Sequence, residues 1–216
     1  FVTTLRFIEN DLGTKGILAL ADALKDNPLV TCFHITQDRE EYDDSCFVAV
    51  ARALKTNRSL RTLILHCMDF GAEVPASVAD MLAVNQSLTE LQLPAVDMDD
   101  AGVAAICQAV AKSNRSLQYL DLSGNPVSEV GVTAAAEMLA HPDVRLKGLK
   151  LSAEEMEADD AAVVSLASAL MVNTSLTCLH LEDVPLGESG ARAIAHALTK
   201  NSFTALAKLA LQSCNI

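Results

Sequence analysis

Residues 114–127 read NRSLQYLDLSGNPV, and this stretch decides the fold because it recurs, with variations, eight times in the 216 residues. Its frame is L-x-x-L-x-L-x-x-N-x-V, in which Leu120 is the second leucine. That position returns every 28 to 30 residues, at Leu5, Phe33, Leu63, Leu91, Leu120, Leu149, Leu179 and Leu209. So steady a period indicates a repeat protein in which each unit is one small structural element.

The second half of each unit has helical periodicity. In the first unit, apolar residues at i, i+3, i+4 and i+7 share one helix face, and they are Ile17, Leu20, Ala21 and Leu24. In most units an asparagine follows this segment, at Asn27, Asn57, Asn85, Asn114, Asn173 and Asn201. We expect this asparagine to adopt the left-handed conformation that often ends a helix. Each unit is therefore predicted to be a strand, a loop and a helix of about three turns.

One such unit is too small to cover its own apolar side, so neighbouring units must stack and bury a continuous core between them. Because a helix is wider than a strand, the stack must curve. The sequence predicts an α/β solenoid shaped like a horseshoe, with a parallel sheet on the concave side and helices on the convex side. Residues 1–216 are expected to form a single domain of about eight units.

The frame, its period and the helical second half resemble the ribonuclease-inhibitor class of leucine-rich repeats. That class includes the repeats of NOD-like receptors, the Ran GTPase activator and tropomodulin. The resemblance covers the whole chain and implies the horseshoe fold. The chain begins at Phe1 within a strand unit and stops at Ile216 before another helix, so we interpret it as a segment of a longer protein.

Composition indicates an intracellular protein. Half of the residues are apolar, yet no run of 18 apolar residues indicates a membrane span, and no signal peptide opens the chain. The six cysteines include no CxxC pair, which favours reduced thiols and a cytoplasmic location. A net charge of −12 disfavours nucleic acid as a partner.

Side chains alternate along a strand, so the third, fifth and seventh frame positions should point into the horseshoe. The residues there are mixed and mostly small, with charges of both signs, and suit a binding surface. We select His34, His66, Glu90, Tyr119, Asp121 and His180 as candidate partner-binding residues. No HExxH motif or phosphate-binding loop occurs, and the Cys178–His180 pair lacks an orienting third group. No catalytic residue, cofactor or metal is therefore predicted.

The charged residues are sorted along each unit. Of the 28 acids, 21 lie between a strand end and a helix start, whereas 9 of the 16 bases lie between a helix end and a strand start. The helix dipole favours this order, but the loops of the second and sixth units hold more acids than it requires. We therefore predict that an acidic rim attracts a basic protein partner, with six acids chosen as candidates: Asp43, Asp44, Glu154, Glu155, Glu157 and Asp159.

The preferred interpretation is a non-enzymatic scaffold that binds another protein through its concave face and acidic rim. Three alternatives follow from the resemblance alone. The first is a regulator that activates a small GTPase, like the Ran activator. The second is an actin-associated cytoskeletal regulator, because residues 16–27 (GILALADALKDN) resemble a tropomodulin repeat. The third is the repeat segment of an innate-immune sensor.

Overall fold

The computed structural model describes residues 1–10, 12–36, 42–153, 156, 161–200 and 205–214. Strands and helices alternate along this part of the chain. The strands are β1 (Thr4–Ile8), β2 (Cys32–Thr36), β3 (Thr62–His66), β4 (Glu90–Gln92), β5 (Tyr119–Leu122), β6 (Gly148–Ser152), β7 (Cys178–Glu182) and β8 (Lys208–Gln212). The helices are α1 (Gly13–Lys25), α2 (Ser45–Leu54), α3 (Glu73–Val84), α4 (Asp100–Lys112), α5 (Glu129–Ala140), α6 (Ala161–Val172) and α7 (Gly187–Lys200).

The strands form one sheet in which every pairing is parallel and the order is that of the sequence, β1 to β8. The register aligns the second leucine of each unit with that of the next, as at Leu91 and Leu120. The same alignment joins Leu120 to Leu149 and Leu149 to Leu179. The strand register predicted from the frame is therefore confirmed.

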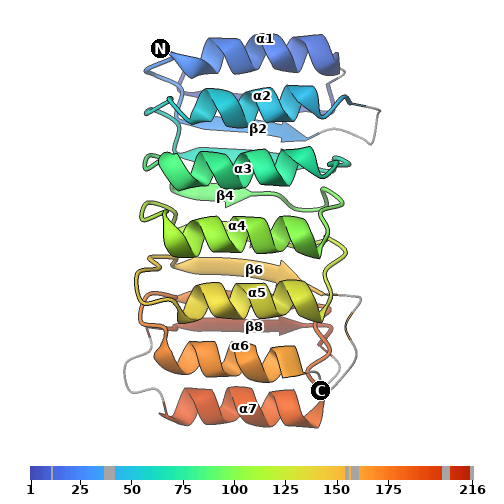
Figure 1. Cartoon of the computed structure of the whole chain (residues 1–216), viewed down its shortest axis with the longest axis vertical. Helices are drawn as coiled ribbons and strands as arrows, with labels where there is room; N and C mark the ends of the chain where they lie inside the picture. Colours follow the sequence, from blue (N-terminus) through green and yellow to red (C-terminus); the bar gives the residue numbers. More distant parts are fainter. Residues whose placement is uncertain (11, 37–41, 154–155, 157–160, 201–204, 215–216) are drawn as a thin grey trace.

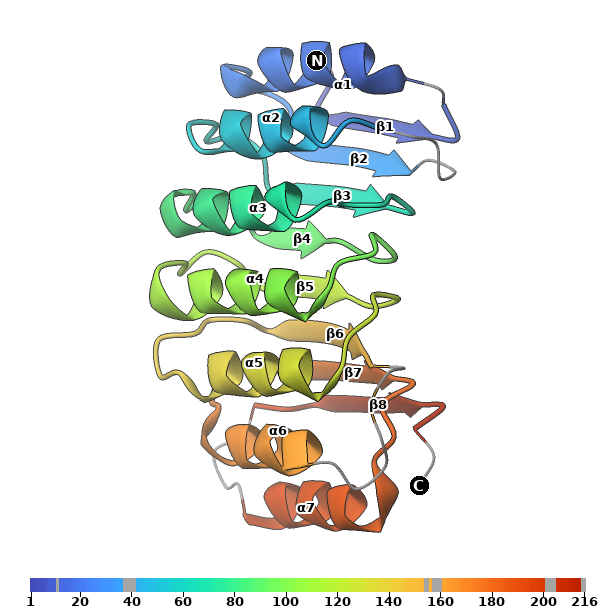
Figure 2. The ribbon, with the colours of Figure 1, turned by 45° about the vertical axis from the view of Figure 1, so that its right-hand side comes forward.

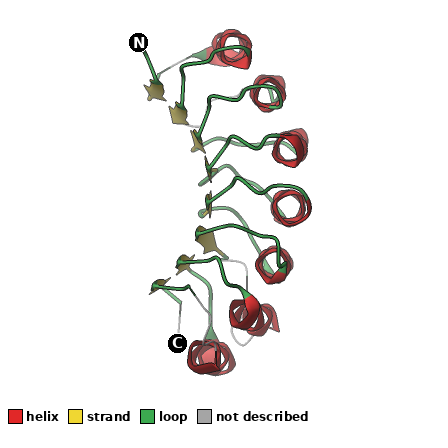
Figure 3. Cartoon of the chain, turned by 90° about the vertical axis from the view of Figure 1, so that its left-hand side faces the viewer, coloured by secondary structure: helices red, strands yellow, loops and turns green. Residues whose placement is uncertain are grey.

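The molecule is a curved two-layer stack (Figures 1 and 2). Viewed along the strands, the sheet lies on the inner side of the arc and the helices on the outer side (Figure 3). The predicted parallel-sheet horseshoe is confirmed. This curvature gives the molecule a broad concave face made of strand side chains.

The core lies between the two layers and is aliphatic. Leu120, Leu149 and Leu179 are 0–1% exposed and pack under the helices with Val103 and Ile106 of α4, which are equally buried. Burying one such side chain contributes about 1.5–3 kcal/mol, so the stacked units stabilise one another. Along strands such as β2, β3 and β7, buried side chains alternate with partly exposed ones. The partly exposed side chains lie on the concave face.

The unit-ending asparagines have a different role from the predicted one. None of the described asparagines has a positive φ, so the expected left-handed helix end is wrong. Asn85 instead donates from Nδ2 to the carbonyl oxygen of Leu54 at 2.6 Å, while its Oδ1 accepts from the N–H groups of Ser87 and Leu88, each at 2.8 Å. It is 1% exposed. The carboxamide satisfies backbone groups of two successive units that would otherwise be buried without partners.

The left-handed conformation occurs at another position, one residue beyond the seventh frame position. Ala95 has φ 51°, Gly124 has φ 67° and Asp183 has φ 53°. The chain turns there from the sheet toward the helix layer. Glycine adopts this conformation freely, but the other residues do so at a steric cost.

Candidate functional site

The structure places all six predicted concave-face residues on strands of the sheet. His34 lies on β2, His66 on β3, Glu90 on β4, and His180 on β7, while β5 carries Tyr119 and Asp121. The register puts Glu90 beside Tyr119, and it puts Lys150 of β6 between Asp121 and His180. Glu90, Tyr119 and Asp121 are therefore neighbours at the centre of the concave face.

His34 is held near the start of this face. Its Nε2 forms a 2.8 Å hydrogen bond with the Thr36 hydroxyl. Burial lowers the pKa of His34 below its usual 6.5, and the positive charges of Arg6 and His66 lower it further. His34 is therefore neutral at physiological pH and offers a hydrogen bond rather than a charge to a partner.

At the centre, Glu90 and Tyr119 are held in fixed positions. One Glu90 carboxylate oxygen accepts from the Thr62 hydroxyl at 3.0 Å and the other from the Gln92 amide at 2.5 Å. The Tyr119 ring lies against Gly148 so closely that a Cβ there would come within 2.5 Å of Tyr119 Cδ2. Burial raises the pKa of Tyr119, with smaller contributions from the charges of Asp121, Cys178 and Glu90. Gly148 makes room for the aromatic ring, a role the sequence analysis did not predict.

Beside this centre the face is hollowed. A depression of about 320 Å³ is lined by His66, Asp121, Lys150, Ser152, Glu182 and Asp183, among others. Lys150 Nζ lies 3.3 Å from Glu182 Oε2. Asp121 is only 7% exposed, and its Oδ1 accepts from the N–H and the hydroxyl of Ser123 at 3.0 and 2.6 Å. We call this depression, with its three carboxylates and one ammonium group, the concave hollow.

Sequence reasoning selected Asp121 and His66 from the hollow and passed over Lys150 and Glu182. Both occupy frame positions that point into the horseshoe, so the signal was present. Their pairing became visible only through the strand register, which aligns residues about one repeat apart.

Of the six candidate rim acids, the two that the structure describes both bind backbone amides. Asp43 Oδ1 accepts from the Ser45 N–H at 2.8 Å, and this bond lowers the pKa of the Asp43 carboxyl. Asp44 Oδ1 accepts from the Gly71 N–H in the next unit at 3.0 Å. Glu154, Glu155, Glu157 and Asp159 lie outside the described residues. Asp43 and Asp44 therefore stabilise the loop backbone, as acids at helix starts commonly do.

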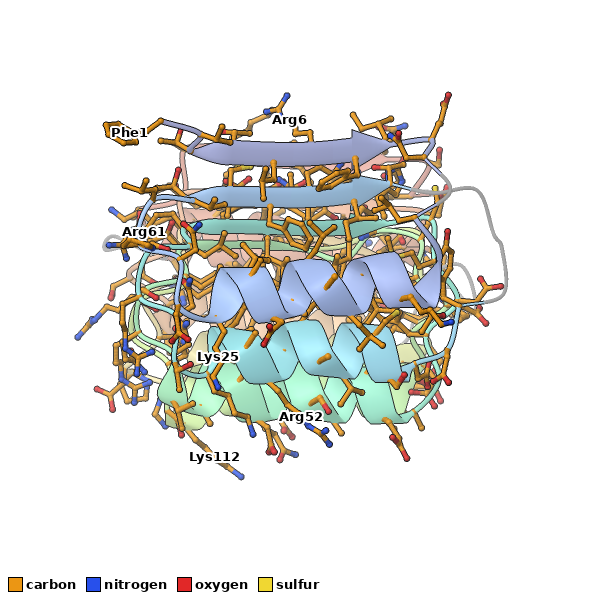
Figure 4. All side chains as sticks on the ribbon, turned by 90° about the horizontal axis from the view of Figure 1, so that it is seen from above. Phe1, Arg6, Lys25, Arg52, Arg61 and Lys112 are labelled. Carbon is orange, nitrogen blue, oxygen red and sulfur yellow. The ribbon has the colours of Figure 1, made fainter. Side chains whose placement is uncertain are left out.

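The opposite rim is basic. Figure 4 shows Lys25, Arg61 and Lys112 toward the edge where the strands begin and the helices end. Arg115 at this edge donates to the carbonyl oxygens of Ala111 and Asn114, at 3.1 and 2.9 Å. Bases at helix ends complement the helix dipole, so much of this sorting is structural.

In the part of the chain that the structure describes, no three His, Cys, Asp or Glu side chains are grouped so that they could hold a metal ion. None of the helices described there combines the length and apolar character needed to cross a bilayer. All six cysteines are free thiols.

The repeat geometry matches a known family. The model of the family described as Leucine Rich repeat matches residues 113–134 and 172–195. Each segment runs from a helix-ending asparagine through a strand and a left-handed turn into the next helix. The chain is a leucine-rich-repeat protein.

Curated relatives of this leucine-rich-repeat protein are much longer. It is 30% identical over 157 residues to NACHT, LRR and PYD domains-containing protein 12 of Mus musculus, covering 73% of this chain and 12% of the relative. It is 31% identical over 220 residues to NACHT, LRR and PYD domains-containing protein 14 of Mus musculus, and this match covers 99% of this chain and 21% of the relative. NACHT, LRR and PYD domains-containing protein 9 of Bos taurus is 28% identical, and this match covers 90% of this chain and 19% of the relative. The chain thus spans 12% to 21% of the length of these relatives.

Two solved structures share the fold of this leucine-rich-repeat protein. Leiomodin-1 Actin-Binding Site 2 superimposes with a TM-score of 0.57 at 16% identity, covering 70% of this chain and 86% of the other. The tropomodulin C-terminal domain of Caenorhabditis elegans superimposes with a TM-score of 0.59 at 13% identity, covering 74% of this chain and 93% of the other. The fold-level resemblance to tropomodulin is therefore confirmed.

Proposed function

We propose that this leucine-rich-repeat protein is a non-enzymatic scaffold that binds a basic segment of another protein on its concave face. The observation that carries the proposal is the concave hollow, which is lined by three carboxylates and one ammonium group; Tyr119 lies on β5, the strand that also carries Asp121. Tyrosine is among the residues that most often dominate the binding energy of protein interfaces. The excess negative charge of the hollow attracts a basic group. The six free thiols are consistent with action in the cytoplasm.

The electrostatic part of the proposal concerns the rate of association. A net charge of −12 attracts a basic partner over a distance and repels nucleic acid. Such steering acts mainly on the association rate and weakens as salt is added. Contacts at the concave face are short-range, so they act mainly on the dissociation rate.

The test begins with a partner recovered from cell extract and compares binding kinetics of three variants at low and high salt. A rim variant replaces Glu154, Glu155, Glu157 and Asp159 with the corresponding amides, leaving Asp43 and Asp44 to hold their backbone amides. It should associate more slowly at low salt. Tyr119→Ala should dissociate faster.

The control is Glu137→Gln, which removes an exposed acid from helix α5 on the convex side. It should leave both rates unchanged. A rim variant that associates as fast as the wild type at low salt, together with an unaffected dissociation rate for Tyr119→Ala, would overturn the proposal.

A second candidate partner is actin. The observation in its favour is the fold shared with Leiomodin-1 Actin-Binding Site 2. Co-sedimentation with filamentous actin tests this candidate directly. If Tyr119→Ala reduces the amount that sediments and Glu137→Gln does not, actin is the partner of the concave face. If the chain stays in the supernatant at all actin concentrations, this candidate is eliminated.

A further inference from the structure

Asp121 is an unusual carboxylate because it is buried on a face that should be wet. It is 7% exposed and lines the concave hollow. Both of its described hydrogen bonds reach Oδ1, from Ser123, and no donor within the described residues bonds to Oδ2. Oδ2 is not one of the buried side-chain atoms without a partner in the described residues, so this oxygen is open to the hollow.

The base beside Asp121 forms its ion pair with another acid. Lys150 is its partner in the strand register, yet among the described ion pairs Lys150 contacts Glu182 of β7. The hollow also contains Asp183. Three carboxylates and one ammonium leave two negative charges uncompensated in a partly enclosed space. Such a space concentrates its field and favours a cation.

An aromatic side chain lies on the same strand as Asp121. Tyr119 lies two residues before Asp121 on β5 and rests on the bare backbone of Gly148. Glu90 of β4 is the register partner of Tyr119, and Asp121 lies two residues further along β5, so the three residues are neighbours on the sheet. An aromatic ring beside carboxylates is a favourable place for a planar cation.

We propose that the concave hollow receives the guanidinium group of an arginine side chain from the protein partner, with Tyr119 packing beside it. This inference rests on the proposed protein-binding function and names the chemistry of one contact. The guanidinium donates to the free Asp121 oxygen on β5, and it adds a positive charge near the carboxylates of Glu182 and Asp183 at the end of β7. Its five N–H donors in one plane match acceptors spread over two strands better than a compact ammonium does.

The test uses N-acetyl-arginine amide as the probe and the uncharged N-acetyl-citrulline amide as its isosteric control. The chain contains two tyrosines, so ring-labelled protein gives two sets of NMR signals, from Tyr42 and Tyr119. The arginine probe should shift the Tyr119 signals in a saturable manner and leave those of Tyr42 in place. The citrulline probe should produce no saturable shift.

Asp121→Asn should weaken binding of the arginine probe about tenfold, because the charge is lost while the Ser123 hydrogen bonds can remain. Asp97→Asn is the matched control: it removes one exposed acid, and Asp97 is not among the residues lining the hollow. It should leave the affinity unchanged. Glu182→Gln provides a second reading if Asp121→Asn does not fold, and it should also weaken binding.

Equal shifts with both probes, or equal weakening by Asp97→Asn and Asp121→Asn, would overturn the inference. The proposed function is judged separately, by the binding kinetics of the partner. If Tyr119→Ala releases the partner faster but the arginine probe does not bind, the concave face binds protein and the guanidinium assignment is wrong. If neither occurs, both proposals fail.

Discussion

Asn114 donates from Nδ2 to the carbonyl oxygens of Leu82 and Asn85, both at 2.9 Å. Its Oδ1 accepts from the N–H groups of Ser116 and Leu117, at 3.0 and 2.8 Å. Asn114→Ala leaves these buried groups without partners, and each such loss costs about 1–3 kcal/mol. We therefore expect the free energy of unfolding to fall by at least about 3 kcal/mol in urea denaturation.

Gln86 is the matched control for Asn114. Its carboxamide also joins two units, donating to the Ser113 carbonyl and accepting from the Arg115 N–H, but it is exposed. Water replaces its partners when it is lost, so Gln86→Ala should cost less than about 1 kcal/mol. Equal losses for the two variants would show that burial is not what makes the asparagine important.

A second residue-scale prediction concerns the left-handed turn at Ala95. An L-residue pays about 1–2 kcal/mol in this conformation, and glycine avoids that cost but loses more backbone entropy on folding. Ala95→Gly should raise the free energy of unfolding by about 0.5–1 kcal/mol. Ala19→Gly, at an exposed position within helix α1, should lower it by a similar amount. A stabilising effect at both sites, or at neither, would contradict the steric argument.

The sequence alone located the unit-ending asparagines but did not predict their role. The unit-ending asparagines were predicted at the correct positions with the wrong conformation. Their partners are carbonyl oxygens of the preceding unit, and no local pattern identifies such a contact. Likewise, the burial of Asp121 and the pairing of Lys150 with Glu182 depend on side chains of neighbouring strands. The sequence therefore predicted which residues lie on the concave face but could not predict the hollow that they form.

At the scale of elements, one unit caps the helix of the next. Asp100 of helix α4 accepts through Oδ1 from the N–H groups of Ser128 and Gly131, at 3.0 and 2.9 Å, at the start of helix α5. Asp100→Ala should lower the free energy of unfolding by about 1–3 kcal/mol, because both amides lose an ionised acceptor. Hydrogen exchange should increase at the start of α5 more than in the middle of α4.

The control for Asp100 is Asp69→Ala, which removes an exposed acid of the same rim. It should change stability by less than about 0.5 kcal/mol. If the two variants lower the free energy of unfolding equally, the acids of this rim act through general charge rather than through specific capping hydrogen bonds.

The order and type of the elements followed from the repeat frame, but their lengths did not. Strand β4 contains only Glu90–Gln92, whereas β2 and β3 each contain five residues. Pro94, at the seventh frame position of this unit, has no N–H to donate to the neighbouring strand, which shortens the ladder. The acid-rich loops of the second and sixth units fall mostly outside the described residues.

For the whole molecule, stacking makes the stability of one unit depend on its neighbours. Leu120 is completely buried on a central strand, so Leu120→Ala should cost about 2–5 kcal/mol. Leu5 occupies the same frame position on the first strand but is only partly buried, and Leu5→Ala should cost clearly less. Denaturant titration of both variants tests the comparison. Equal losses would mean that the units fold independently of their position in the stack.

The buried thiols allow the opening of the stack to be timed. Burial raises the pKa of Cys107 in helix α4 to about 12 and that of Cys46 in helix α2 to about 11, whereas Cys32 and Cys178 are partly exposed on the concave side. Only a thiolate reacts quickly with an alkylating reagent. At neutral pH we expect Cys32 and Cys178 to be alkylated first, and Cys107 only when its repeat opens. Mass spectrometry of partly alkylated protein would then measure how often the centre of the horseshoe comes apart while both ends stay folded.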